Sequence, residues 1–193
     1  YGVSAILDIP LFGKTLNLNA DYYYTHFLNQ LIVDMDSDPH ALSFTNLNSK
    51  SYSHAFQIDA TYPVFDGFTL TAAYRLTDVK QTIGGELREA PLTSRYKVLV
   101  SAGYKTPLEL WQFDVTLAIN GVGRLPDPYT MPDGSLSWER SFKAYPQLQA
   151  QVTRDFPHFS VYGGGENLTG FKQQNPIIGS ADPWGKDFEG TMT

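Results

Sequence analysis

Three aspartates spaced two residues apart, Asp34, Asp36 and Asp38, are the first residues whose pattern could carry chemistry. Alternate carboxylates in a loop can ligate Ca²⁺, because hard cations take oxygen ligands. An EF-hand loop starting at Asp34 would need glycine in place of Pro39 and glutamate in place of Thr45, so that motif is absent. Two interpretations stay open: a looser Ca²⁺ or substrate-metal site, and a solvated acidic loop, which is the simpler of the two.

Histidines and the remaining carboxylates do not form a catalytic pattern. His40 lies close to the three aspartates and could join them as a ligand, whereas the other histidines are scattered. A pair of carboxylates could serve as acid and base in a glycosidase. No spacing singles out such a pair, and there is no Ser-His-Asp context, phosphate loop or zinc pattern, so we expect neither an enzyme nor a cofactor. The candidate carboxylates are Asp8, Asp21, Asp59, Asp114 and Glu166.

Composition limits the elements that could position these residues. The 193 residues carry a net charge of −6 with no clustered Lys/Arg stripe, so nucleic acid is not expected as a partner. Charged residues make up 18% and aromatic residues 14% of the chain. No apolar run approaches the roughly 18 to 20 residues that a membrane-spanning helix needs. Any passage through a membrane would therefore be made by strands.

Alternation of apolar and polar residues is the dominant pattern. In the run 95–105, Tyr96, Val98 and Val100 alternate with Lys97 and Leu99. Successive strand side chains point to opposite faces, so each such run has one apolar and one polar face. The pattern predicts an all-β chain of nine strands, at 3–9, 16–25, 54–62, 68–77, 95–105, 113–120, 148–152, 159–165 and 188–192.

The connections between these strands alternate strictly between short and long. Antiparallel outer-membrane barrels have short periplasmic turns and long extracellular loops, whereas soluble sandwiches have no reason to alternate in this way. Four of the expected strands also reach the roughly 9 to 11 residues that a tilted membrane strand requires. The short connections are 10–14, 65–67, 106–110 and 156–158, and the long ones are 35–46, 83–94, 122–144 and 168–187.

Aromatic residues lie at the ends of several apolar stripes, as Tyr96 and Tyr104 do. This placement is typical of the interfacial girdles of a membrane barrel. The fold class predicted is an antiparallel up-and-down transmembrane β-barrel. Bacterial single-chain barrels have an even number of strands and no open edge, so nine strands indicate part of a larger barrel. We expect at least one closing strand after Thr193 and many strands before Tyr1.

The segment Tyr162–Gly170 has the sequence YGGGENLTG. It is similar to the "Y-x-G-x-E-N-L-T" segment near the C-terminus of TonB-dependent outer-membrane receptors, in a subgroup abundant in Bacteroidetes-type Gram-negative bacteria. Glu189 stands where the subgroup usually has aspartate. Further motifs in matching order are 21–27, 30–34, 74–80, Gly85, Leu87, 90–92, Gln173, 175–178, 182–185 and Phe188.

This resemblance implies a barrel of about 22 strands with a plugged lumen. Residues 1–193 would be part of its wall, without the plug and the final strand. The implied function is energised import of a scarce nutrient, such as an iron chelate, haem, cobalamin or a glycan, across the outer membrane. The implied partners are the lipid bilayer, a small-molecule or oligosaccharide ligand, and the TonB energy-transducing complex, which would act through the plug.

Aromatic and arginine side chains in the long connections are the candidates for contacts with substrate, because such residues often anchor ligands. Their alternative role is that of rim or girdle residues. A second function class is also open, a soluble all-β ligand- or carbohydrate-binding module whose aromatic residues are ligand platforms. The candidates are Arg124, Tyr129, Trp138, Arg140 and Trp184.

Overall fold

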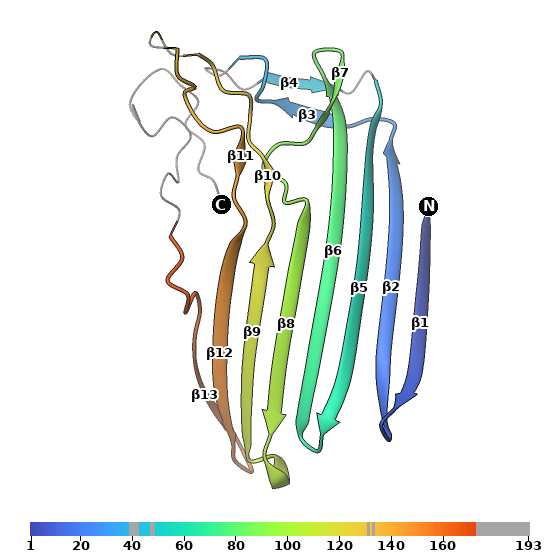
Figure 1. The fold of residues 1–193 in the computed structure, drawn as a ribbon, viewed down its shortest axis with the longest axis vertical. Coiled ribbons are helices and arrows are strands. Elements are labelled where there is room, and N and C mark those ends of the chain that lie inside the picture. Colours follow the sequence, from blue (N-terminus) through green and yellow to red (C-terminus); the bar gives the residue numbers. More distant parts are fainter. Residues whose placement is uncertain (39–42, 47–48, 131, 133, 173–193) are drawn as a thin grey trace.

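A computed structural model describes residues 1–38, 43–46, 49–130, 132 and 134–172. The chain forms one large antiparallel sheet in which consecutive long strands are neighbours (Figure 1). This arrangement confirms the all-β, up-and-down prediction. In order across the sheet the strands are β1 (Gly2–Leu11), β2 (Lys14–Phe27), β5 (Ser51–Phe65), β6 (Phe68–Ile83), β8 (Tyr96–Lys105), β9 (Trp111–Asn120), β12 (Tyr145–Asp155) and β13 (Ser160–Gly165).

Eight of the nine expected runs correspond to these strands, and the ninth, 188–192, lies outside the described residues. The strands extend beyond the alternating runs; β12, for example, covers Tyr145–Asp155 rather than 148–152. Backbone pairing with two neighbours continues past the last alternating side chain, because ladder hydrogen bonds do not depend on side-chain polarity.

The long connections were expected as loops, and here the prediction was incomplete. The first three long connections include or adjoin short strands, because their backbone groups pair with each other or extend a long strand. A single 3₁₀ turn, η1 (Pro107–Glu109), lies in the short connection between β8 and β9. The short strands are β3 (Leu31–Asp34) paired with β4 (Ser43–Asn46), β7 (Glu86–Glu89) paired with β6, and β10 (Gly123–Arg124) paired with β11 (Ser141–Phe142).

Short and long connections lie at opposite ends of the sheet, as Figure 1 shows. The tight turn between β1 and β2 has positive φ angles of 49° at Phe12 and 77° at Gly13. Gly67, between β5 and β6, has a φ of 85°, and a Cβ there would meet the carbonyl oxygen of Lys105 at 2.2 Å. Only glycine fits this turn, because it needs both the left-handed conformation and the close approach.

Strand register brings the separate apolar stripes onto one face of the sheet. Tyr62, Leu70, Ala102, Val115 and Ala150 form one row across five strands. Because a shift of one residue would move a whole stripe to the other face, this register is decisive for the surface of the sheet. The result is a continuous apolar face, hereafter the apolar face.

The opposite side of the sheet, hereafter the polar face, carries an equally continuous row. Thr61, Thr71, Ser101, Thr116 and Gln149 lie side by side, one residue displaced from the apolar row. The hydroxyls of Thr61 and Thr71 are 3.1 Å apart, and those of Ser101 and Thr116 are 2.9 Å apart. These contacts keep the polar side chains hydrogen-bonded within the sheet.

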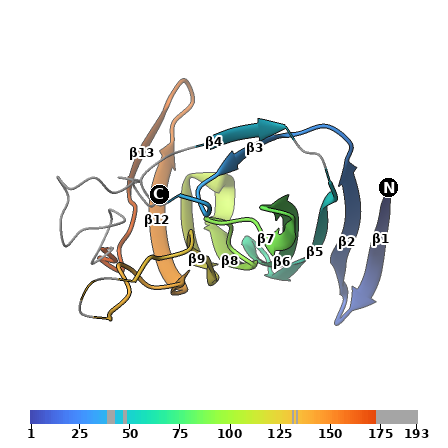
Figure 2. The same ribbon diagram turned by 90° about the horizontal axis from the view of Figure 1, so that it is seen from above.

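The sheet is curved and open, with β1 and β13 at its two edges (Figure 2). Large side chains of the apolar face are exposed, among them Leu70, Val115 and Val152. Within the described residues the buried hydrophobic side chains are Ile32, Ile83, Ala90 and Leu125, all at the end of the long connections. No helix in the described part of the chain is long and apolar enough to cross a membrane.

Candidate functional site

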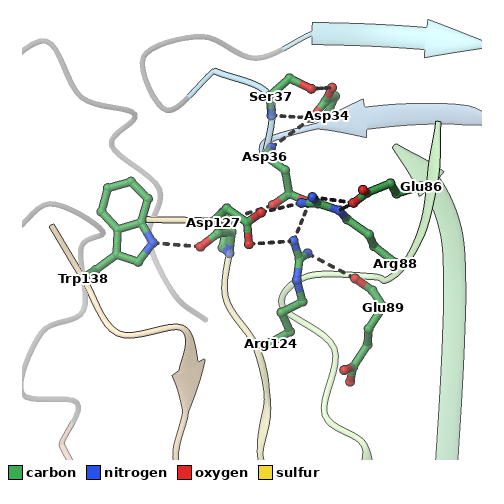
Figure 3. Close-up of polar contacts among 10 residues, drawn as sticks. Asp34, Asp36, Ser37, Glu86, Arg88, Glu89, Arg124, Asp127 and Trp138 are labelled. Carbon is green, nitrogen blue, oxygen red and sulfur yellow. Dashed lines mark hydrogen bonds and ion pairs between the residues drawn. The ribbon is translucent and has the colours of Figure 1, made fainter. Parts of the chain in front are cut away.

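An ion-pair cluster joins three long connections at one end of the sheet (Figure 3). The Arg124 guanidinium in β10 donates from Nη2 to Oδ2 of Asp36 at 2.6 Å and to Oδ1 of Asp127 at 3.2 Å. Its Nη1 donates to the carbonyl oxygen of Glu89 at 3.1 Å. The Asp36 side chain is only 1% exposed and that of Arg124 15%, so their contact is shielded from water.

A second arginine extends the cluster toward solvent. Arg88 in β7 donates from Nη1 to Asp127 and from Nη2 to Glu86 at 2.8 Å. These partners raise the pKa of Arg88 further above its ordinary value, led by the hydrogen bond to Glu86. Asp127 therefore lies between two guanidinium groups from different connections (Figure 3). Its backbone amide also donates to Oδ1 of Asp36 at 3.0 Å, which closes the cluster.

Asp34 and Asp36 have opposite pKa shifts. Burial alone raises the pKa of Asp34, but hydrogen bonds from the Ser37 hydroxyl, the Ser37 amide and the Asp36 amide lower it more, so it lies below its ordinary value. Burial raises the pKa of Asp36 above its ordinary value, and the Asp127 amide and Arg124 offset only part of that effect. Asp34 thus fixes the local turn, whereas the partners of Asp36 offset only part of what burial costs its charged form.

Two of the predicted loop residues meet beside this cluster. The rings of Tyr129 and Trp138 pack edge to face with centroids 5.7 Å apart. Nε1 of Trp138 donates to the carbonyl oxygen of the fully buried Pro126 at 2.9 Å. The indole is therefore held by the connection on which it lies, and this favours a structural part for Trp138 in shaping the surface.

The other three candidate residues for substrate contacts lie in different surroundings. Arg124 is the centre of the cluster. Arg140 is exposed, and its side chain makes no ion pair within the described residues, although its carbonyl oxygen accepts from the Leu125 amide at 3.0 Å. Trp184 lies outside the described residues. Arg124, Tyr129 and Trp138 thus belong to one neighbourhood of the fold.

Two of the three aspartates of the candidate metal site, Asp34 and Asp36, have separate partners. Asp34 accepts from the backbone amides of Asp36 and Ser37, at 2.9 and 3.0 Å. Asp36 pairs with Arg124, so its carboxylate is already engaged by a guanidinium. No cluster of three or more metal-ligating side chains occurs in the described part of the chain. At Asp36 the structure therefore has a buried ion pair, whereas the simpler interpretation of the sequence was a solvated acidic loop.

Sequence reasoning did not single out Arg88, Glu89 or Asp127. Arg88 and Asp127 lie in different connections, 39 residues apart. Their charges were visible in the sequence, but only the packing of the connections shows which charges meet. Arg95 forms a further pair by donating from Nε and Nη2 to the two carboxylate oxygens of Glu89, at 2.7 and 2.8 Å.

Three of the polar-face carboxylates, Asp8, Asp59 and Asp114, are each engaged by a neighbouring side chain. Asn17 donates to Asp8 at 2.6 Å and Asn19 donates to Asp59 at 2.8 Å. Asp114 accepts from Gln112 at 2.8 Å and lines an open groove of about 390 Å³ near the β13 edge. The groove is also lined by Thr116, Gln149, Ala150, Gln151, Tyr162, Gly164, Gly165 and Glu166.

Aromatic side chains form two belts across the apolar face. The first, near the long connections, contains only tyrosine and histidine, and Tyr22 contributes a hydroxyl 2.7 Å from Nδ1 of His54. The second, near the short turns, is dominated by phenylalanine. The long-connection belt is Tyr1, Tyr22, Tyr24, Tyr52, His54, Tyr74 and Tyr96, and the short-turn belt is Phe65, Phe68, Tyr104, Trp111, Phe113, Phe156 and Phe159.

Comparison of the chain with protein-family descriptions, with curated proteins and with solved structures finds no match.

Proposed function

We propose that this chain forms part of the wall of an outer-membrane β-barrel, in a TonB-dependent receptor that imports a scarce nutrient. The observation that carries the proposal is the register that unites the apolar stripes of consecutive strands into one exposed face. In a soluble protein so large an apolar surface would need a covering layer. Lipid acyl chains would cover such a continuous apolar face, and the polar face would then line an aqueous lumen.

Spacing of the two aromatic belts supports the membrane assignment. On β8 they are represented by Tyr96 and Tyr104, eight residues apart. That distance is about 27 Å along an antiparallel strand, or about 20 Å along the membrane normal at a tilt of ~40°. With the width of the rings added, the belts bracket a band close to the ~25 Å apolar band of outer-membrane barrels.

The long connections support a receptor rather than a simple pore. Arg124, Asp36, Asp127 and Arg88 link three connections that leave different strands. Such cross-linking holds the connections in a defined arrangement, as a binding surface requires. The substrate class under this proposal is a small molecule or oligosaccharide that contacts this end of the barrel before it enters the lumen.

Spin labels on the two faces of one strand test the membrane assignment. In the full-length protein reconstituted in lipid, labels at Val115 and Leu117 should be accessible to oxygen dissolved in the bilayer. Labels at Thr116 and Ala118 should instead be accessible to a water-soluble nickel complex. A soluble sandwich would bury the Val115 and Leu117 labels in protein and leave them shielded from both reagents, and that result would exclude the barrel.

Transport is tested separately, by growth on limiting nutrients. Cells that lack the full-length protein should fail to grow on one scarce iron chelate, haem, cobalamin or glycan. Cells that keep the protein but lack the TonB complex should show the same defect. Growth that depends on the protein but not on the energy complex would contradict the energised mechanism while leaving the barrel assignment intact.

A further inference from the structure

Arg154 has an unusual position on the apolar face. It lies in β12, opposite Trp111 on β9 and opposite Val161 on β13. Its guanidinium carbon lies 4.9 Å from the ring centroid of Trp111 and 5.4 Å from that of Phe156. A charged group thus lies over two aromatic rings, within the short-turn belt.

The guanidinium of Arg154 has no carboxylate or other hydrogen-bond acceptor within the described residues. Two other cations near the belts, Lys80 and Lys14, have carboxylate partners. Lys80 lies 3.7 Å from Asp78 near the long connections, and Lys14 pairs with Asp66 at a short turn. Because a guanidinium carries five N–H donors, contacts to ring faces alone leave its hydrogen-bonding capacity unused.

We propose that Arg154, flanked by Trp111 and Phe156, binds the phosphodiester of a glycerophospholipid headgroup in the leaflet on the short-turn side. The inference rests on the proposed barrel and adds a specific lipid site to it. Charge complementarity is the argument: a planar cation with no carboxylate partner in the described part of the chain lies at the depth of an aromatic belt, where lipid phosphates lie.

Geometry explains why arginine suits this position. Ring contacts orient the plane of the guanidinium, so that its N–H groups can meet two phosphate oxygens at once. The acyl chains of the same lipid would then pass over Val152 and Val115, which lie on the apolar face toward the middle of the sheet. The phosphate would therefore contact the Arg154 cation, and the acyl chains would contact apolar side chains.

Native mass spectrometry of the full-length protein, released from outer membranes in detergent, tests this site by measuring which lipids the protein retains. The probes are phosphatidylglycerol and a diacylglycerol with identical tails but no phosphate. We expect the wild-type protein to retain phosphatidylglycerol in preference to diacylglycerol. Arg154→Gln should weaken phosphatidylglycerol retention about tenfold, the effect of losing one charge-assisted contact.

Three variants serve as controls. Arg75→Gln removes an arginine from the polar face, where Arg75 pairs in register with Lys97, and should leave lipid retention unchanged. Arg154→Lys keeps the charge but loses the planar fork, so its retention should fall between those of the wild type and Arg154→Gln. Trp111→Leu should weaken retention with Arg154 still present.

Two results would overturn the inference. The first is equal phosphatidylglycerol retention by the wild type and Arg154→Gln. The second is displacement of the lipid by millimolar glycerol phosphate, since that would make this a site for soluble phosphates. Spin labels at Leu117 in the same variants separate this failure from failure of the barrel: a lipid-exposed label with unchanged retention removes only the headgroup site.

Discussion

Arg124 contacts Asp36 through a 2.6 Å hydrogen bond that spans 88 residues of sequence. The contact joins the connection after β9 to the connection after β2, and both side chains are largely shielded from solvent. A shielded pair of this kind does not need to add much net stability, but removing one partner leaves the other charge unpaired and poorly hydrated. Its main effect is to fix how the connections lie against each other.

Arg124→Met should therefore loosen the long connections without unfolding the sheet. We expect a local loss of about 3 kcal/mol, which corresponds to a ~100-fold fall in hydrogen-exchange protection at the Asp127 amide. The double variant Asp36→Asn/Arg124→Met should recover part of that protection, because no unpaired charge remains. Arg140→Met, at an exposed arginine, should change protection by less than about twofold. Equal effects at Arg124 and Arg140 would contradict the cluster.

Acidification should release the turn held by Asp34. Its pKa is lower in the folded state than its ordinary value of 3.8, so its contribution to stability is complete above 3.8 and is lost as pH falls through the folded value. Hydrogen exchange at the amides of Asp36 and Ser37, corrected for the intrinsic pH dependence, should show this loss of protection. In Asp34→Asn the protection should already be low at neutral pH and should change little on acidification.

Charge placed on the two faces of β9 should have opposite consequences. Leu117→Arg puts a cation on the apolar face near its middle and should destabilise the inserted protein by about 2–4 kcal/mol. Thr116→Arg, one residue away on the polar face, should be tolerated to within about 1 kcal/mol. Urea unfolding of the full-length protein in lipid vesicles measures both values. Similar losses for the two variants would show that neither face meets lipid.

Neighbouring glycines in β13 should differ in their tolerance of a side chain. A Cβ on Gly164 would lie 2.7 Å from the carbonyl oxygen of Ala150, whereas a Cβ on Gly163 would meet no atom within 4 Å. Gly164→Ala should therefore cost about 1–3 kcal/mol through overpacking against backbone, and Gly163→Ala should be close to neutral. The same urea experiment distinguishes them, and equal stability of the two variants would place β13 in a different register.

Much of the fold could be predicted from local patterns. The alternation of Tyr96, Val98 and Val100 with Lys97 predicted both a strand and its two faces, because side-chain direction in a strand depends only on parity. The short connections that contain Gly13 and Gly67 could also be predicted, because glycine readily adopts the positive φ angles that tight turns need.

The candidate site was less accessible to sequence reasoning. Arg124 was named as a candidate, but as a possible substrate contact rather than as the partner of Asp36. Nothing local to Asp36 indicates which distant arginine it meets, because the pairing depends on how the connections pack after the strands have aligned. Arg154 is a similar case, since its contacts with Trp111 and Phe156 require the register of β9 and β12.

By itself, then, the sequence determined the strands, the polarity of their faces and the alternation of short and long connections, because these follow from the chemistry of neighbouring residues. Tertiary structure alone decided that the stripes join into one apolar face, that Arg124 meets Asp36 and Asp127, and that the Arg154 guanidinium lies over the rings of Trp111 and Phe156. The physical reason is range: parity and turn geometry act over a few residues, whereas register and ion pairing depend on segments that the folded sheet brings together.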